Sequence, residues 1–206
     1  MIMGMFYEQF WEGDSETLGD FELKWPKLSQ YIPKEKGVNI VDFGCGKGEM
    51  IGAMKKINPN AHYMGLDVSL TALEYANKKY IGVSFKKIED GGPLPVSDGF
   101  ADLVFTSEVV EHIYDTNNAF RELGRITKRG GAILLTTPHH GFIKNLMLVL
   151  FGFDTHFSPT GPHVRFFTNK SLFALLEKNG FEIQKFGYYG RFYPVPHSVF
   201  VLARKK

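Results

Sequence analysis

The sequence contains a single cysteine, Cys45, among its 206 residues. One cysteine cannot form a disulfide bond within the chain, and such scarcity fits a reducing compartment better than a disulfide-stabilised secreted fold. An excess of charge of one sign is also lacking, because 24 Lys and Arg balance 22 Asp and Glu to a formal net charge of +2. Nucleic-acid binding depends on a concentrated positive surface, and we therefore do not expect a nucleic-acid partner.

Long hydrophobic runs are absent as well. The longest apolar stretch, residues 146–153, is far shorter than the roughly 20 residues that span a bilayer. Residues 1–8 lack a basic region followed by an apolar run, so we expect no signal peptide and a cytoplasmic location, with a peripheral membrane contact left open. Without internal repeats or low-complexity tracts, residues 1–206 are predicted to form one domain.

What the sequence does contain is a hydrophobic strand that runs into a glycine-rich turn. Gly44, Gly46 and Gly48 follow the strand predicted over 38–43 and precede a predicted helix. Glycine has no Cβ, which lets a ligand approach the main chain closely. The next predicted strand, 62–67, ends in an acid, Asp67, which is placed to hydrogen-bond ribose hydroxyls. This combination predicts a nucleoside cofactor.

The spacing of the glycines separates two cofactor classes. A dinucleotide site requires G-x-G-x-x-G, whereas the third glycine here comes one residue early, and Asp42 precedes the first glycine by two positions. A carboxylate there would repel a pyrophosphate but can pair with an ammonium group. S-adenosylmethionine carries an adenosine and an α-ammonium without a phosphate. The turn therefore favours S-adenosylmethionine over NAD.

Further motifs follow this turn in a fixed order, at residues 65–69, 94–104, 107–113 and 166–168. With them, residues 35–206 resemble the class I S-adenosylmethionine-dependent methyltransferases, and are similar to the O-methyltransferases of ubiquinone pathways. The resemblance implies an α/β fold with a doubly wound, Rossmann-like sheet. It further implies seven strands in the order 3-2-1-4-5-7-6, with strand 7 antiparallel and helices on both faces. The sequence pattern alone predicts only the alternation of strands and helices.

Hydrophobic periodicity and turn residues predict the elements. Strands are expected near 38–43, 62–67, 83–87, 101–107, 131–137, 181–188 and 198–204. Helices are expected near 48–57, 69–80, 115–127, 142–151 and 169–179. Gly130 and Gly131 are expected to end the helix at 115–127. Residues 1–36 are interpreted as an N-terminal helical cap, and residues 139–166 as an insertion or lid on the substrate side.

The resemblance also implies roles for individual residues around the cofactor. Asp42 would orient the methionine ammonium, Asp67 would bind the ribose hydroxyls, and Val68 would pack on the adenine. Relatives usually have an acid for the adenine amino group where this chain has Lys87, so either Glu89 or Asp90 is expected to replace it. The expected cofactor-binding residues are Asp42, Gly44, Cys45, Gly46, Gly48, Asp67, Val68, Ile88, Glu89 and Ser107.

Six of the seven histidines fall after the carboxyl ends of predicted strands or in the insertion. Imidazole is the side chain best suited to proton transfer near neutral pH. His112, His139 and His140 are therefore predicted to be catalytic, with His163 as a further candidate. Together with the many aromatic residues near the insertion, they predict methyl transfer to a small, apolar or aromatic acceptor, with oxygen favoured.

The run Glu108-x-x-Glu111-His112 has two interpretations. A similar run is associated with a divalent metal in ubiquinone-pathway and small-RNA 2′-O-methyltransferases, and two carboxylates with an imidazole suit Mg²⁺ or Mn²⁺. In many relatives without metal, the first glutamate lines the pocket and the other two residues pack. We assign no metal ligand here. A metal-dependent RNA 2′-O-methyltransferase and a non-catalytic S-adenosylmethionine-binding protein are the alternative functions.

The predicted helix at 142–151 is apolar on nearly all sides. Helices of this kind are usually buried, so we expect a lid or a contact between subunits, and favour both over a membrane surface. A homo-oligomer formed through residues 139–166 stays open.

Overall fold

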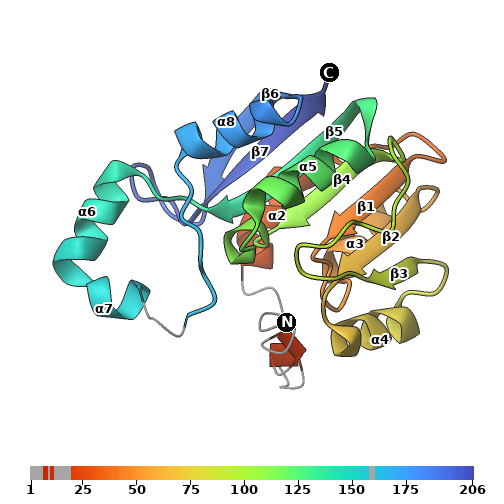
Figure 1. The fold of residues 1–206 in the computed structure, drawn as a ribbon, viewed down its shortest axis with the longest axis horizontal. Helices are drawn as coiled ribbons and strands as arrows, with labels where there is room; N and C mark the ends of the chain where they lie inside the picture. The colour runs from red at the N-terminus through yellow and green to blue at the C-terminus, as the bar shows by residue number, and fades with distance from the viewer. Residues whose placement is uncertain (1–6, 9, 12–19, 158–160) are drawn as a thin grey trace.

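A single seven-stranded sheet organises the chain, with the strand order β3-β2-β1-β4-β5-β7-β6 (Figure 1). The computed structural model describes residues 7–8, 10–11, 20–157 and 161–206. The strands are β1 (Asn39–Phe43), β2 (His62–Asp67), β3 (Ser84–Lys87), β4 (Ala101–Ser107), β5 (Thr127–Pro138), β6 (Phe181–Tyr189) and β7 (Ser198–Lys205). Strands β1 to β5 pair in parallel, and β7 pairs antiparallel with both β5 and β6. The predicted fold class and strand order are confirmed.

Helices cover both faces of this sheet, and Figure 1 shows α5 and α8 together over one of them. The helices with described bounds are α2 (Phe21–Leu28), α3 (Glu49–Ile57), α4 (Leu70–Lys79), α5 (Thr116–Ile126), α6 (Phe142–Phe151), α7 (Phe153–His156) and α8 (Asn169–Lys178). Two short 3₁₀ turns, η1 (Ser29–Tyr31) and η2 (Val110–His112), complete the elements. None of the described helices combines the length and the apolar composition that crossing a bilayer requires.

The central strands are hydrophobic throughout because both of their faces are buried. Successive side chains of a strand point to opposite faces, so Ile40 of β1 packs with α2, α3 and α4, while Val41 packs with α5 and α8. Leu103 and Val104 of β4 divide in the same way. The sheet thus has one core on each face, and the rigid strands between them hold the loops at their carboxyl ends.

Gly130 and Gly131 do not stop a helix as predicted. Helix α5 already ends at Ile126, where the Thr127 hydroxyl donates to the Leu123 carbonyl oxygen at 2.6 Å. The glycines lie within β5, at an irregularity where pairing with β4 shifts from Ala101–Thr127 to Leu103–Ala132. The hydroxyl of Thr127 replaces the expected glycine at the end of the helix.

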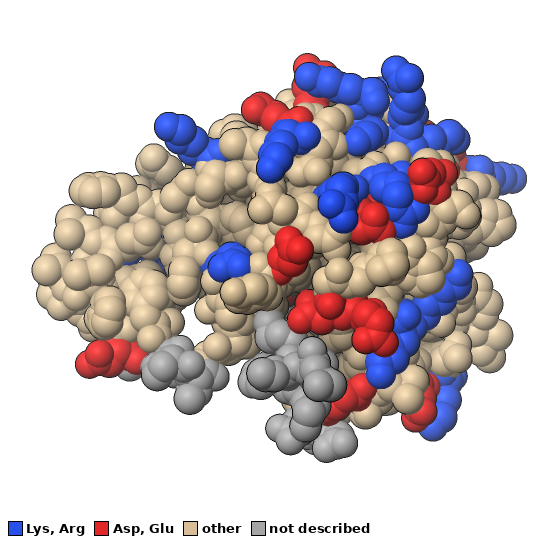
Figure 2. Space-filling model, viewed as in Figure 1, with Lys and Arg blue, Asp and Glu red and all other residues tan. Residues whose placement is uncertain are grey.

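Helices α6 and α7 project away from the sheet as a separate lobe, which we call the apolar lobe (residues 142–157) (Figure 1). The bounds predicted for α6 are confirmed, and in a single copy of the chain the helix is mostly exposed. Phe142 and Phe151 are 79% and 83% exposed, and among the residues of α6 only Lys144 is buried. The lobe appears in Figure 2 as a surface almost without charge. Its apolar residues therefore do not form part of either core.

Candidate cofactor and active site

One cavity of about 390 Å³ opens where β1, β2 and β4 end. Ligands of open α/β sheets bind at this edge of the parallel strands. Of the ten residues predicted to bind the cofactor, nine line this cavity; they are Asp42, Gly44, Cys45, Gly46, Asp67, Val68, Ile88, Glu89 and Ser107. Gly48 is instead the left-handed N-cap of α3 and lies against the ring of Tyr80. The sequence prediction thus converges on a single site.

The glycine turn approaches neighbouring side chains so closely that a Cβ added to Gly44 or Gly46 would clash with them. A Cβ on Gly44 would lie 2.3 Å from Val109 Cγ2, and a Cβ on Gly46 would lie 2.7 Å from Trp11 Cζ2. Both glycines also have positive φ angles, which side chains disfavour. Cys45, between them, is buried, and burial raises the pKa of its thiol. This cysteine is therefore a small residue of the turn rather than a reactive thiolate.

Asp67, at the end of β2, holds the glycine turn through a hydrogen bond. Its Oδ2 accepts a hydrogen bond from the Gly46 amide at 2.8 Å, and its Oδ1 accepts one from the Ser69 amide at 2.9 Å. Burial raises the pKa of this carboxyl, while the two amide bonds oppose the shift. Each oxygen keeps a further lone pair, and a pair of adjacent hydroxyls is the chemical group that suits two such acceptors.

Opposite charges without enough partners lie at the inner end of the cavity. Lys24 of α2 is fully buried, with its ammonium 2.9 Å from Asp20 Oδ1. Asp20 Oδ2 and Asp42 Oδ2 are buried and accept no hydrogen bond from the described residues. Burial, with a contribution from Asp67, raises the pKa of Asp42 to about 8. An ammonium and a carboxylate, as in an amino acid, would satisfy this set, and the methionine end of S-adenosylmethionine carries both.

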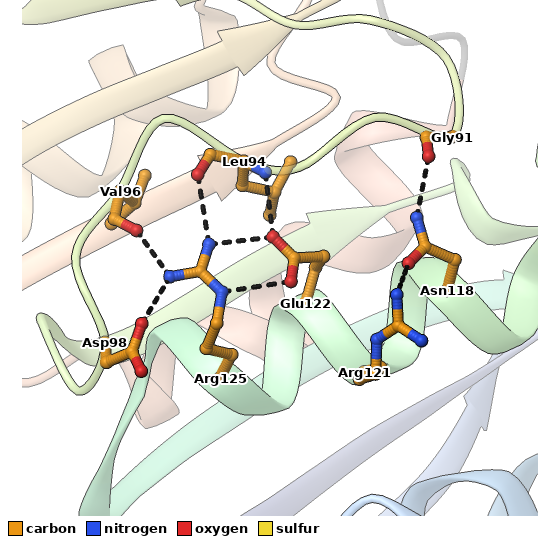
Figure 3. Close-up of polar contacts among 8 residues, drawn as sticks. All are labelled: Gly91, Leu94, Val96, Asp98, Asn118, Arg121, Glu122 and Arg125. Carbon is orange, nitrogen blue, oxygen red and sulfur yellow. Dashed lines mark hydrogen bonds and ion pairs between the residues drawn. The ribbon is translucent and has the colours of Figure 1, made fainter.

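The opposite end of the cavity is formed by the loop after β3, which contains Ile88, Glu89 and Asp90. Figure 3 shows how α5 holds this loop. The guanidinium of Arg125 donates to the carbonyl oxygens of Leu94 and Val96 and to the Asp98 carboxylate, at 3.0, 2.8 and 2.6 Å. Glu122 accepts from the Leu94 amide at 2.8 Å. The acids expected to contact adenine are therefore carried on a loop fixed from one helix.

His112 is the one predicted catalytic histidine that lines the cavity. Burial lowers its pKa, so the imidazole is neutral at pH 7. Its Nδ1 lies 3.0 Å from the Pro162 carbonyl oxygen, which can only accept, and we therefore assign the proton to Nδ1. The other nitrogen, Nε2, is left as an acceptor 3.8 Å from Glu111 Oε1.

His139 and His140 lie outside the residues that line the cavity. The ring of His139 packs against Tyr188 at 5.0 Å between centroids. His140 Nδ1 lies 3.1 Å from Asn145 Oδ1, and its ring packs against Phe166. Burial lowers the pKa of His140 to about 4. Both histidines are thus placed at the base of the apolar lobe.

The two glutamates of the Glu108-x-x-Glu111 run have different surroundings. Glu108 has a positive φ of 55°, and its carboxylate accepts hydrogen bonds from the hydroxyls of three residues, Thr136, Tyr189 and Ser198. Glu111 uses only Oε2, which accepts from Thr137, and its buried Oε1 accepts no hydrogen bond from the described residues. The two carboxylates therefore have separate partners and do not act as a pair.

A different group could hold a metal ion. Glu111, His112 and His163 each present one donor atom, and these atoms all lie within 4.8 Å of one another. One carboxylate oxygen and two imidazole nitrogens suit a first-row divalent metal, and the unpartnered Glu111 Oε1 is among the donors. The residues present thus fit a divalent ion, in another combination than the Glu108, Glu111 and His112 set that the sequence left open.

Sequence reasoning missed Lys24 and the Glu122–Arg125 pair. Arg125 follows Glu122 by three positions, a spacing typical of helical ion pairs, but its contacts with the loop 94–98 are not visible from that spacing. Lys24 follows Asp20 by four positions, a spacing that is likewise typical of helical ion pairs. Only the burial of these charges distinguishes them from surface pairs.

Comparison with known proteins places this site in a family. The model of a methyltransferase domain matches residues 19–185. A malonyl-[acyl-carrier protein] O-methyltransferase of Marinomonas sp. is 28% identical over 143 residues, which are 68% of this chain and 53% of the relative. A 27-O-demethylrifamycin SV methyltransferase of Amycolatopsis mediterranei is 26% identical over 61% of this chain and 48% of the relative. The chain spans about half the length of these curated relatives.

Solved structures share the fold. The methyltransferase from a complex with the Haloferax volcanii Trm112 activator superimposes with a TM-score of 0.77 at 17% identity, over 95% of this chain and 96% of that one. An S-adenosylmethionine-dependent methyltransferase of Mesorhizobium loti superimposes with a TM-score of 0.70 at 19% identity, over 88% and 97% of the two chains. With the family match over most of its length, the chain belongs to the class I S-adenosylmethionine-dependent methyltransferases.

Proposed function

We propose that this enzyme transfers the methyl group of S-adenosylmethionine to a hydroxyl of a small, apolar acceptor, with His112 as the general base. The observation that carries the proposal is the position of His112, whose imidazole shares one cavity with the glycine turn and with Asp67. S-adenosylmethionine supplies an already activated methyl group. The protein then has to align the acceptor and remove its proton.

The hydrogen bonds of His112 support this role. With Nδ1 donating to the Pro162 carbonyl, Nε2 is the nitrogen that can take a proton from a hydroxyl. Glu111 Oε1 lies 3.8 Å from Nε2, so Glu111 in its ionised form would stabilise the imidazolium that forms. Burial and the nearby Glu108 raise the pKa of Glu111. His139 and His140, which lie at the base of the lobe, are not needed for this step.

The surroundings of His112 support an apolar acceptor. The ring of Tyr7 contacts the ring of His112 edge-on, at 5.8 Å between centroids. Val109, Ile113 and Pro162 line the same cavity as His112. Apolar walls with few polar groups favour a ligand of similar character. The relative of Marinomonas sp. is an O-methyltransferase, which supports transfer to oxygen.

The test uses S-adenosylmethionine with an isotope-labelled methyl group and a small-molecule extract. We expect label in an acceptor with the wild type and a turnover lower by about 10²–10⁴-fold with His112→Gln, while S-adenosylmethionine still binds. His62→Gln is the matched control, because His62 is exposed at the start of β2. Undiminished turnover by His112→Gln would contradict the role of His112 as the base. A product methylated at nitrogen or carbon would contradict a hydroxyl acceptor.

The second candidate is a metal-dependent 2′-O-methyltransferase of RNA. The observation in its favour is the convergence of Glu111, His112 and His163. It requires that EDTA abolishes methyl transfer to RNA and that Mn²⁺ restores it. Turnover of a small acceptor in the presence of EDTA would decide for the first candidate.

A further inference from the structure

A short N-terminal segment lies across the cofactor cavity; we call its described residues, Tyr7, Glu8, Phe10 and Trp11, the strap. Tyr7, Phe10 and Trp11 line the cavity together with the glycine turn. Apart from Asp20 and Lys24, the other residues that line the cavity are far from the strap in the sequence. Its position is therefore set by side-chain contacts, of which three join it to separate parts of the site.

The first contact is made by Glu8 at the N-terminus of α4. Glu8 Oε1 accepts a hydrogen bond from the Leu70 amide at 2.7 Å, and Oε2 accepts from the Thr71 amide at 3.1 Å and from the Ser69 hydroxyl at 2.9 Å. These hydrogen bonds lower the pKa of Glu8 to about 2. The carboxylate is thus ionised at neutral pH and bound at three points to residues more than 60 positions away.

This contact is coupled to the acid expected at the ribose. Ser69 donates its hydroxyl to Glu8 and its amide to Asp67 Oδ1, at 2.9 Å in both cases. Glu8 and Asp67 are therefore held by the same residue. A movement of the strap away from α4 changes the hydrogen bonds of Ser69 beside the ribose site.

The other two contacts are made by the rings of Trp11 and Tyr7. The ring of Trp11 packs on Gly46, in the space that a Cβ would occupy, with Lys47 Nζ 5.5 Å from the ring centroid. The ring of Tyr7 contacts His112. The strap thus contacts the glycine turn, the serine that holds the ribose acid, and the proposed base.

We infer that the strap closes over bound S-adenosylmethionine and that Glu8 is the latch that holds it closed. The three hydrogen bonds of Glu8 must break before the cofactor or its demethylated product can leave. Glu8 is a positioning residue, because it touches α4 rather than the reacting atoms. The inference rests on the cofactor of the family and is independent of the identity of the methyl acceptor.

The experiment measures dissociation of S-adenosylhomocysteine by stopped-flow tryptophan fluorescence. The chain has two tryptophans, and a Trp25→Phe background leaves Trp11, which packs on the turn, as the reporter. In this background we expect Glu8→Gln to raise the dissociation rate constant roughly tenfold and to leave the association rate constant within about threefold. Glu74→Gln, on the exposed face of α4, is the matched control and should leave both constants unchanged.

A second measurement reports closure directly. We expect S-adenosylhomocysteine to protect Trp11 from acrylamide quenching, and Glu8→Gln to remove most of that protection. Equal dissociation rates for Glu8→Gln and its parent would overturn the latch. A faster association with unchanged dissociation would also overturn it, because the strap would then obstruct binding instead of retaining the ligand. If the parent protein binds no S-adenosylhomocysteine, the latch fails together with the cofactor site, whereas binding without an identified acceptor leaves it intact.

Discussion

The cofactor edge of the sheet and the apolar lobe distribute their polar and apolar residues in opposite ways. At the cofactor edge, charged groups such as Lys24 and Asp42 are buried, and apolar side chains pack around them. In the lobe, Phe142, Leu150 and Phe151 are exposed, whereas the charged residue Lys144 is the buried residue of α6. Buried charges cost free energy unless they are paired. Apolar side chains left in water lose the stabilisation that burial would give them. The two regions therefore differ in what the chain leaves uncompensated, which is buried charge at the cofactor edge and exposed apolar surface in the lobe.

The contrast also shows which region the fold itself requires. Both cores extend to the strands that carry the cofactor turn, so a change in the sheet reaches the site. The lobe contributes no residue to either core. Mutations in the two regions should accordingly separate stability from binding.

The largest effect is expected in the core beside the site. Phe120 of α5 is fully buried, and Phe120→Ala should lower the free energy of unfolding by about 3–5 kcal/mol. The cause is the lost burial of the ring together with the cavity that remains. Urea unfolding followed by circular dichroism measures the change. A loss below about 1 kcal/mol would mean that this core is not packed as described.

The next effect is on cofactor binding. Gly44→Ala places a Cβ 2.3 Å from Val109 Cγ2 at a φ of +76°, and should weaken S-adenosylmethionine binding by at least about 100-fold. The matched control is Gly82→Ala, which has a φ of +80° but nothing within 4 Å of the added Cβ. Calorimetric titration of both variants separates the steric clash from backbone strain. Equal affinities of the two variants would contradict the role of close packing in the turn.

A smaller effect concerns pH. The pKa of Asp42 is raised to about 8, so the carboxyl is protonated at pH 6 and must release its proton to pair with the cofactor ammonium. Affinity should therefore rise with pH by up to about tenfold per unit between pH 6 and 8. Asp42→Asn should bind more weakly and lose this dependence. Methylthioadenosine, which lacks the amino-acid part, should bind the wild type without it, and an equal slope for both ligands would exclude Asp42 as its source.

The smallest effect is expected in the lobe. Leu150 is 62% exposed, and Leu150→Ala should change the free energy of unfolding by less than about 0.5 kcal/mol. Unfolding at two protein concentrations makes the test sharper. A loss of more than 1 kcal/mol that grows with concentration would show that a second copy covers the lobe, as the oligomer prediction requires.

The sheet could be predicted from the sequence because its signals are local. The bounds predicted for β2 and β4 are confirmed residue for residue, since each strand is a hydrophobic run between turn residues. The glycine turn and Asp67 come together because they follow neighbouring parallel strands. The antiparallel direction of β7 was implied by the family resemblance, and no spacing in the sequence indicates it.

Other features depend on contacts between distant residues and could not be predicted. Glu8 and Ser69 are separated by 61 positions, and nothing near Glu8 indicates that α4 will receive its carboxylate. Lys24 resembles an ordinary surface lysine until the fold buries it. The exposure of α6 could not be predicted either, because composition indicates how apolar a helix is and not whether anything packs against it.

Lys144 gives the apolar lobe a property that its hydrophobic residues cannot provide. A helix that is apolar on every side can rotate about its long axis with little change in the area that it buries. Lys144 removes this freedom, because its ammonium donates to the His197 carbonyl oxygen at 3.1 Å in the turn before β7. The rotational setting of α6, and thereby the choice of side chains that it presents outward, is thus fixed by its one buried charge together with the contact of Asn145 to His140.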